Sequence, residues 1–278
     1  RSVNKGAELN PAVDLLPLLG CGKEPGAFRK LIAEAAGVRE EHLLSTELFL
    51  YPRTKAVQTG LNGEFIVSPR LDDLQCVFGC LEGFLAAKPG GSLPVLAVFN
   101  NEEVGSNTRQ GADSTFLTDV LERIAHGCGL DSEGWKAAVA NSFMVSADNA
   151  HAIHPAHPEY ADKGEFPVLG GGIVIKYNAN QRYTTDAVSG AVFQAICQEA
   201  GVPVQRYSNR ADLPGGSTLG NISTAHLSVP TVDIGLPQLA MHSICETAGA
   251  ADTDHLVKAM TAYFSRDFHR DRDGGIVF

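Results

Sequence analysis

The alternation of short apolar segments with longer amphipathic ones, from residue 63 to the C-terminus, constrains the fold more than any other feature. Residues 65–67, 93–99 and 173–176 are apolar and rich in branched side chains, as buried strands are. The longer segments between them, such as 73–87, have the length and pattern of helices. Strands that alternate with helices of about 10 to 15 residues are typical of parallel sheets covered by helices. We therefore predict an α/β fold with a mixed, mainly parallel sheet flanked by helices.

The same patterns predict the remaining elements and a division of the chain. Further strands are predicted over 46–51, 142–147, 202–207 and 231–234, and further helices over 27–36, 116–128, 186–200 and 251–264. The regular alternation is missing from the first 60 or so residues. We therefore predict two parts, residues 1–62 and residues 63–278.

Composition narrows the classes of partner. The chain is 44% hydrophobic and 19% charged, with a net charge of -10, and this acidity argues against nucleic acid and anionic membranes as partners. No apolar run approaches the roughly 18 residues of a membrane span, and no signal peptide is recognisable. The six cysteines have no CxxC spacing, as expected of a reducing compartment. We expect a cytoplasmic protein.

Two adjacent carboxylates, Glu102 and Glu103, follow the predicted strand over 93–99. Neighbouring carboxylates repel each other, and burying them costs free energy unless a cation or a proton separates their roles. A divalent metal does so when one glutamate ligates it and the other acts as general base towards a water molecule. The alternative is a pair of solvated glutamates on a loop.

Other strand ends carry metal-ligating side chains as well. Asp72 lies between a predicted strand and a predicted helix, Asp148 directly follows a predicted strand, and His242 follows the strand over 231–234 after a short turn. Alone, each has an ordinary explanation: a helix cap, a turn residue or a histidine at the edge of the core. Together they favour a pair of divalent metals about 3.5 to 4 Å apart, bridged by a carboxylate. Zinc suits these ligands, and so do cobalt and manganese.

Five motifs carry a resemblance to a known family. They are Ser-Pro-Arg-Leu-Asp-Asp (68–73), Asn-Glu-Glu-Val-Gly-Ser (101–106), Ser-Ala-Asp-Asn-Ala-His-Ala-Ile-His-Pro (146–155), Lys-Tyr-Asn-Ala-Asn-Gln-Arg-Tyr (176–183) and Leu-Ala-Met-His-Ser (239–243). In order and spacing the chain resembles the aspartyl aminopeptidases, the M18 family of dinuclear zinc exopeptidases. The resemblance implies a phosphorylase/hydrolase-like fold and two divalent metal ions per chain.

The resemblance also implies roles for the metal-site residues. Asp72 would bridge the two metals, Asp148 would hold one of them, and Glu103 with His242 would hold the other. Glu102 would be the catalytic general base. The family takes one more histidine ligand from a segment upstream of these motifs, and no residue of this sequence matches it.

For the substrate, the resemblance implies three further residues. Lys176 and Tyr183, seven positions apart, would together bind the acidic side chain of a substrate, because an ammonium and a phenol can share one carboxylate. His151 would line the site near the substrate. The alternative for the first two is an exposed strand lysine and a tyrosine at the edge of the core.

The function implied by the resemblance is removal of an N-terminal aspartate or glutamate from peptides. Residues 1–62 would belong to an inserted dimerisation domain, so a homo-oligomer built from dimers is expected, up to a dodecamer. Two alternatives stay open: a dinuclear aminopeptidase of other specificity, and an inactive scaffold if the upstream histidine is truly absent.

Overall fold

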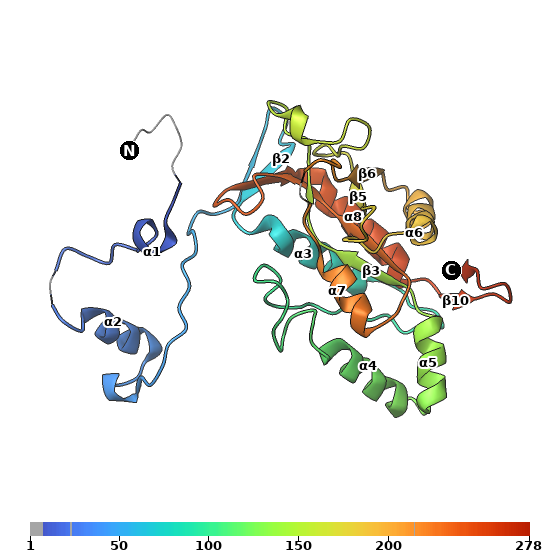
Figure 1. Cartoon of the computed structure of the whole chain (residues 1–278), viewed down its shortest axis with the longest axis horizontal. Helices are drawn as coiled ribbons and strands as arrows, with labels where there is room; N and C mark the ends of the chain where they lie inside the picture. Colours follow the sequence, from blue (N-terminus) through green and yellow to red (C-terminus); the bar gives the residue numbers. More distant parts are fainter. Residues whose placement is uncertain (1–7, 23, 214) are drawn as a thin grey trace. The chain divides into compact units, whose positions relative to one another are not determined.

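The computed structural model describes residues 8–22, 24–213 and 215–278. It divides into two compact units, Arg1–Tyr51 and Pro52–Phe278 (Figure 1). Residues 1–7 of the predicted first part lie outside the described residues, and the predicted boundary after residue 62 stays a prediction. No helix in the described part of the chain combines the length and the apolar character that crossing a bilayer requires.

The first unit consists of short helices with little core of its own. It contains α1 (Pro11–Asp14), α2 (Ala27–Ala36) and the 3-10 helix η2 (Glu40–His42). Glycines in the left-handed conformation, Gly26 and Gly37, begin and end α2. Of the described residues of this unit, Ala33 alone is buried. The strand predicted over 46–51 is wrong, because those residues form no strand in the structure.

The second unit contains a four-stranded mixed sheet in the order β3-β7-β5-β6. Its strands are β3 (Met144–Ala147), β7 (Thr231–Gly235), β5 (Ile173–Tyr177) and β6 (Val204–Ser208). The pairs β3–β7 and β5–β6 are parallel, and β5–β7 is antiparallel. This confirms the predicted α/β fold with a mixed, mainly parallel sheet.

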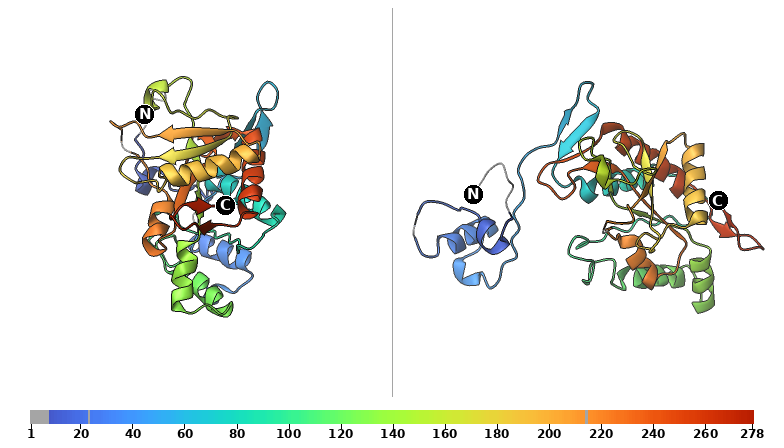
Figure 2. Two further views of the ribbon diagram at one scale, coloured as in Figure 1. Left: turned by 90° about the vertical axis from the view of Figure 1, so that its right-hand side faces the viewer. Right: turned by 45° about the horizontal axis from the view of Figure 1, so that its top comes forward.

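Helices cover both faces of this sheet. Alternate residues of each strand point to opposite faces, so a strand can pack against helices on both sides. They are α3 (Leu71–Ala86), α6 (Ala187–Glu199), α7 (Leu219–His226) and α8 (Ala250–Phe264). In β7, Val232 and Ile234 are fully buried in the core that contains Phe193 of α6 and Leu256 of α8. Asp233 points to the other face, where its carboxylate accepts a hydrogen bond from Thr218, the residue before α7. Figure 2 shows α6 alongside the sheet.

A second, five-stranded sheet has the order β1-β2-β9-β8-β4 and is mostly antiparallel. Its strands are β1 (Val57–Thr59), β2 (Phe65–Ser68), β9 (Glu246–Gly249), β8 (Pro237–Leu239) and β4 (Ala150–His151). Only β4 and β8 pair in parallel among its described strands. This sheet was not predicted, and it matters for the site because Asp72 follows β2 and His242 follows β8.

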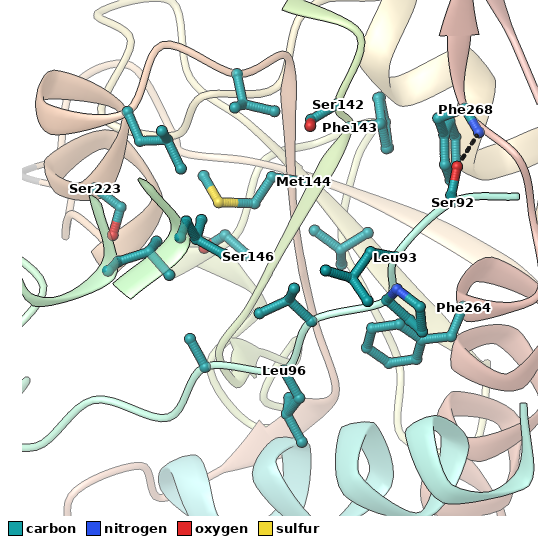
Figure 3. A pocket seen from close by; sticks show the side chains of 18 of the residues that line it. Ser92, Leu93, Leu96, Ser142, Phe143, Met144, Ser146, Ser223, Phe264 and Phe268 are labelled. Carbon is teal, nitrogen blue, oxygen red and sulfur yellow. Dashed lines mark hydrogen bonds between the residues drawn. The ribbon is translucent and has the colours of Figure 1, made fainter. Parts of the chain in front are cut away.

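The predicted strand over 93–99 is also wrong. Within the described chain this segment pairs with no strand, and it lines one side of an apolar cavity of about 540 Å³. Leu93 and Leu96 lie opposite Met144 of β3 across this cavity, and Phe264 of α8 closes one end (Figure 3). Without a neighbouring strand its backbone lacks the ladder partners that define a strand.

The remaining elements complete the second unit. They are α4 (Phe116–Gly127), α5 (Ser132–Ala140), the 3-10 helix η3 (Pro158–Tyr160) and the hairpin of β10 (His269–Arg270) and β11 (Ile276–Val277). Helices α4 and α5 contribute side chains to the apolar cavity, whereas none of the predicted metal ligands lines it.

Candidate metal centre

Three predicted ligands from three distant segments converge on one point. The Nε2 atom of His242 lies 3.0 Å from an Asp72 carboxylate oxygen and 3.1 Å from a Glu103 carboxylate oxygen. One ligand atom from each residue lies within 4.8 Å of the other two. The Asp72 side chain is 5% exposed, whereas those of His242 and Glu103 are more than half exposed. Two oxygens and an imidazole nitrogen around a common point form a donor set that suits zinc.

A second group of ligand atoms shares Asp72 with the first. Carboxylate oxygens of Asp72, Asp73 and Asp148 all lie within 4.8 Å of one another. Asp72 and Asp73 stand at the start of α3, and Asp148 follows β3 directly. Asp73 has a buried oxygen with no hydrogen-bond partner among the described residues. Asp72 is therefore the residue common to two clusters that could each hold a cation.

A tight turn presents Glu102 and Glu103. The amide of Gly105 donates to the carbonyl of Glu102 at 2.8 Å, and the amide of Ser106 donates to the carbonyl of Asn101 at 2.9 Å. Asn101 and Ser106 both adopt left-handed backbone conformations, with φ of 59° and 63°. These bonds close the loop around the two glutamates, so their side chains emerge from a short, constrained segment.

The electrostatics of this cluster call for a cation. Burial, followed by the negative charges of Asp148 and Glu103, raises the pKa of Asp72 to about 8. Burial, again followed by the charges of Asp148 and Glu103, raises the pKa of Glu102 to about 7. Carboxylates held this close to one another resist ionisation, and a bound divalent cation would relieve the repulsion. The residues present therefore fit a divalent metal centre.

Lys176 of β5 is the basic group of the site. Its ammonium donates to the carbonyl of Asn149 at 2.8 Å and lies 3.3 Å from an Asp148 carboxylate oxygen. The same nitrogen lies 5.5 Å from the centre of the Tyr183 ring. Burial lowers the pKa of Lys176, but the charges of Asp148, Tyr183 and Asp233 together outweigh it, and the pKa is raised above its usual value. Lys176 is thus a buried, charged ammonium, and the exposed strand lysine considered above is excluded.

His151, at the end of β4, lies near these groups on the exposed side. Partial desolvation and the positive charges of Lys176 and His242 lower its pKa. Two further residues belong to the site although the sequence analysis assigned them no role. One is Asp73, which follows Asp72 in the motif, and the other is Glu246, whose buried carboxylate accepts hydrogen bonds from the backbone of Asp72 and His242.

Comparisons with known sequences point to one family. Residues 2–264 match the family model described as aminopeptidase I zinc metalloprotease (M18). A probable M18 family aminopeptidase 2 of Clostridium acetobutylicum is 44% identical over 269 residues, which cover 95% of this chain and 62% of the relative. The corresponding protein of Mycobacterium leprae is 38% identical over 263 residues, with the same two coverages. The chain thus spans about 62% of the length of these curated relatives.

Solved structures agree with this match. An M18 aminopeptidase from Thermotoga maritima superposes with a TM-score of 0.78 at 27% identity, covering 91% of this chain and 58% of that one. The S. cerevisiae mApe1 dodecamer gives a TM-score of 0.74 at 30% identity, covering 85% of this chain and 54% of that one.

Proposed function

Because the chain belongs to the aminopeptidase I zinc metalloprotease (M18) family, we propose that it forms the site of an aminopeptidase that removes N-terminal aspartate or glutamate from peptides. The observation that carries this proposal is the convergence of Asp72, Glu103 and His242 beside a second carboxylate cluster. A buried ammonium, Lys176, stands next to that second cluster.

The proposed metal ligands follow from the two clusters. Asp72 would contribute to the binding of both divalent ions, because it is the member common to both groups. Asp148 would help to hold one ion, and Glu103 with His242 would help to hold the other. Zinc is the proposed metal, and cobalt or manganese would suit the same donors. When bound, the two ions would supply a Lewis acid for the scissile carbonyl and a water molecule of lowered pKa.

Glu102 is the proposed general base. It lies beside the clusters but belongs to neither group of ligand atoms, so its carboxylate is free to accept a proton. Its carboxylate could take a proton from the attacking water and pass it to the leaving amine. No covalent intermediate with the protein is needed in this scheme.

Lys176, Tyr183 and His151 are the proposed substrate-binding residues. The Lys176 ammonium already pairs with one carboxylate, that of Asp148, and a substrate carboxylate is the same kind of partner. Tyr183 is buried beside it and offers a phenol hydroxyl. His151 lies at the exposed side of the site, where a peptide would enter.

Substrate preference is tested with a panel of peptides that differ only in an N-terminal Asp, Glu, Leu or Lys, assayed with zinc. We expect Asp and Glu to be cleaved fastest. Lys176→Met, which keeps the aliphatic stem but removes the charge, should lose this preference while Leu is still cleaved. Because Lys176 also contacts Asp148, the metal content of the variant is measured alongside. Lys136→Met, at an exposed position of α5, is the matched control.

The panel also separates the alternatives. Faster cleavage of Leu than of Asp by the unsubstituted protein would indicate an aminopeptidase of other specificity. If no peptide is cleaved with zinc present, the remaining alternative is that the protein is an inactive scaffold. Retained acidic preference in Lys176→Met would remove Lys176 from substrate binding.

A homo-oligomer built from dimers is the proposed assembly, with residues 1–62 as part of a dimerisation domain. The first unit exposes large apolar side chains, among them Leu16, Leu18 and Phe49, and buries little by itself. A relative of known structure forms a dodecamer. The cytoplasmic location stays a prediction that rests on cysteine usage.

A further inference from the structure

Glu246 is a buried acidic residue without an ionic partner among the described residues. It is the first residue of β9 and lies opposite Ser68 of β2, with 2% of its surface exposed. A carboxylate in such a place costs desolvation free energy unless hydrogen bonds compensate. The hydrogen bonds that offset this cost are all donated by backbone amides.

Three amides donate to this one side chain, from two segments that lie far apart in the sequence. Oε2 accepts from the amide of Leu71 at 2.6 Å and from that of Asp72 at 3.1 Å. Oε1 accepts from the amide of His242 at 2.8 Å. Each oxygen therefore holds one of two segments, those of Asp72 and His242, out of the three that carry the converging ligands.

Both segments need such support, because each contains a strained residue. Arg70, next to Leu71, has φ of 60°, and His242 has φ of 65°. Left-handed backbone is unfavourable for residues other than glycine and persists only where the surroundings hold it in place. The bonds to Glu246 begin at or directly after these two residues, so the carboxylate supports both conformations at once.

We propose that Glu246 is a positioning residue that sets the separation of Asp72 and His242 and thereby the affinity of the metal that Asp72, Glu103 and His242 would hold. It acts through the backbone of the ligands and does not touch the ion. This inference rests on the proposed function, since it concerns a metal bound at the same site.

The chemistry of an amide makes the inference testable with one substitution. Three donors face the two oxygens of Glu246, whereas glutamine has a single acceptor oxygen and an NH₂ group. In Glu246→Gln the oxygen is expected to face the two amides of Leu71 and Asp72. The NH₂ group then faces the amide of His242, where donor opposes donor. The substitution should therefore loosen the His242 segment and spare the Asp72 segment.

The experiment measures zinc binding to the metal-free protein in competition with a chromophoric chelator, for the unsubstituted protein and for Glu246→Gln. We expect Glu246→Gln to bind one zinc ion as tightly as the unsubstituted protein and the second about 10- to 100-fold more weakly, as is usual when support of a ligand is lost. Glu133→Gln on the exposed face of α5 is the matched control and should bind both ions normally.

A merely structural role predicts a different result. Unchanged affinity for both ions in Glu246→Gln, or equal weakening of both together with a lower melting temperature, would overturn the inference. If Glu246→Gln does not fold, Glu246→Asp replaces it. That variant keeps both carboxylate oxygens but shortens the side chain. The affinity for the ion that Asp72, Glu103 and His242 would hold should again be the one that falls. Absence of bound zinc in the unsubstituted protein would refute the proposed function, a failure distinct from normal binding in the variant.

Discussion

Asp72 is the residue of the site that is shared by both ligand clusters and whose pKa is strongly raised. Its carboxylate takes part in both ligand clusters, is nearly buried, and lies close to the negative charges of Asp148 and Glu103. Its pKa of about 8 reflects burial first and the charge of Asp148 second. In the metal-free protein this residue therefore holds a proton at neutral pH, and a bound metal would displace that proton.

The stability of the metal-free protein should depend on Asp72 and on pH. The folded-state pKa of about 8 lies above the unfolded value of about 3.9, so the folded state binds this proton more tightly. The stabilisation is fully present below the unfolded value and is lost as pH rises through about 8. We expect the melting temperature in chelator to fall between roughly pH 5 and pH 9.

Asp72→Asn should flatten this dependence, because the amide does not titrate. Asp254→Asn, at an exposed position of α8, is the control and should keep the slope of the unsubstituted protein. Melting curves followed by circular dichroism in chelator give the slopes. An equal slope in Asp72→Asn would mean that Asp72 is not the group that carries the effect.

The sequence predicts which acidic groups gather, because Asp72, Glu103 and Asp148 each follow an apolar segment that leads towards one edge of the fold. It does not predict Glu246 as their support. That role depends on amides up to 175 residues away and on two left-handed residues, neither of which leaves a local pattern. The pairing of Lys176 with Asp148 depends likewise on the adjacency of strands that are distant in the chain.

At the scale of elements, helix periodicity was the most reliable signal. The predicted helix over 27–36 coincides with α2, and that over 186–200 contains α6, which begins directly after the capping residue Asp186. Apolar runs were less reliable, because a strand needs a partner as well as a pattern. The runs over 46–51 and 93–99 have none in the described chain, whereas the short strands β4, β8 and β9 pair without a distinctive pattern.

Close packing of α3 against α8 depends on two glycines, Gly79 and Gly83. A Cβ atom at Gly83 would lie 2.6 Å from the Cβ of Met260 and 3.0 Å from the backbone of α8. Gly83→Ala should therefore force the helices apart and lower the free energy of unfolding by about 1 to 3 kcal/mol. Urea denaturation measures the change.

Gly127→Ala, at the end of α4, is the matched control for this substitution. No heavy atom lies within 4 Å of the position of its Cβ. The control should be neutral or more stable by up to about 1 kcal/mol, because alanine restricts the unfolded chain. A Gly83→Ala protein as stable as this control would contradict the packing argument.

At the scale of the whole molecule, the proposed assembly can be tested on the exposed apolar side chains of the first unit. Helix α2 exposes Phe28 and Leu31, which are 52% and 46% accessible. The double substitution Phe28→Ser and Leu31→Ser should shift the protein towards smaller species in light scattering coupled to gel filtration. Lys30→Ser on the same helix carries a similar loss of helix propensity and should leave the assembly intact. Unchanged mass in the double variant would exclude α2 from the interface.

The measurement that tests the central claim most directly is zinc content together with hydrolysis of an N-terminal aspartyl peptide, for the unsubstituted protein and Glu102→Gln. A water-activating base beside a two-metal centre predicts about two zinc ions per chain in both proteins, with turnover lower by about 100-fold or more in the variant. Equal turnover in the two proteins, or no zinc in the unsubstituted one, would contradict it.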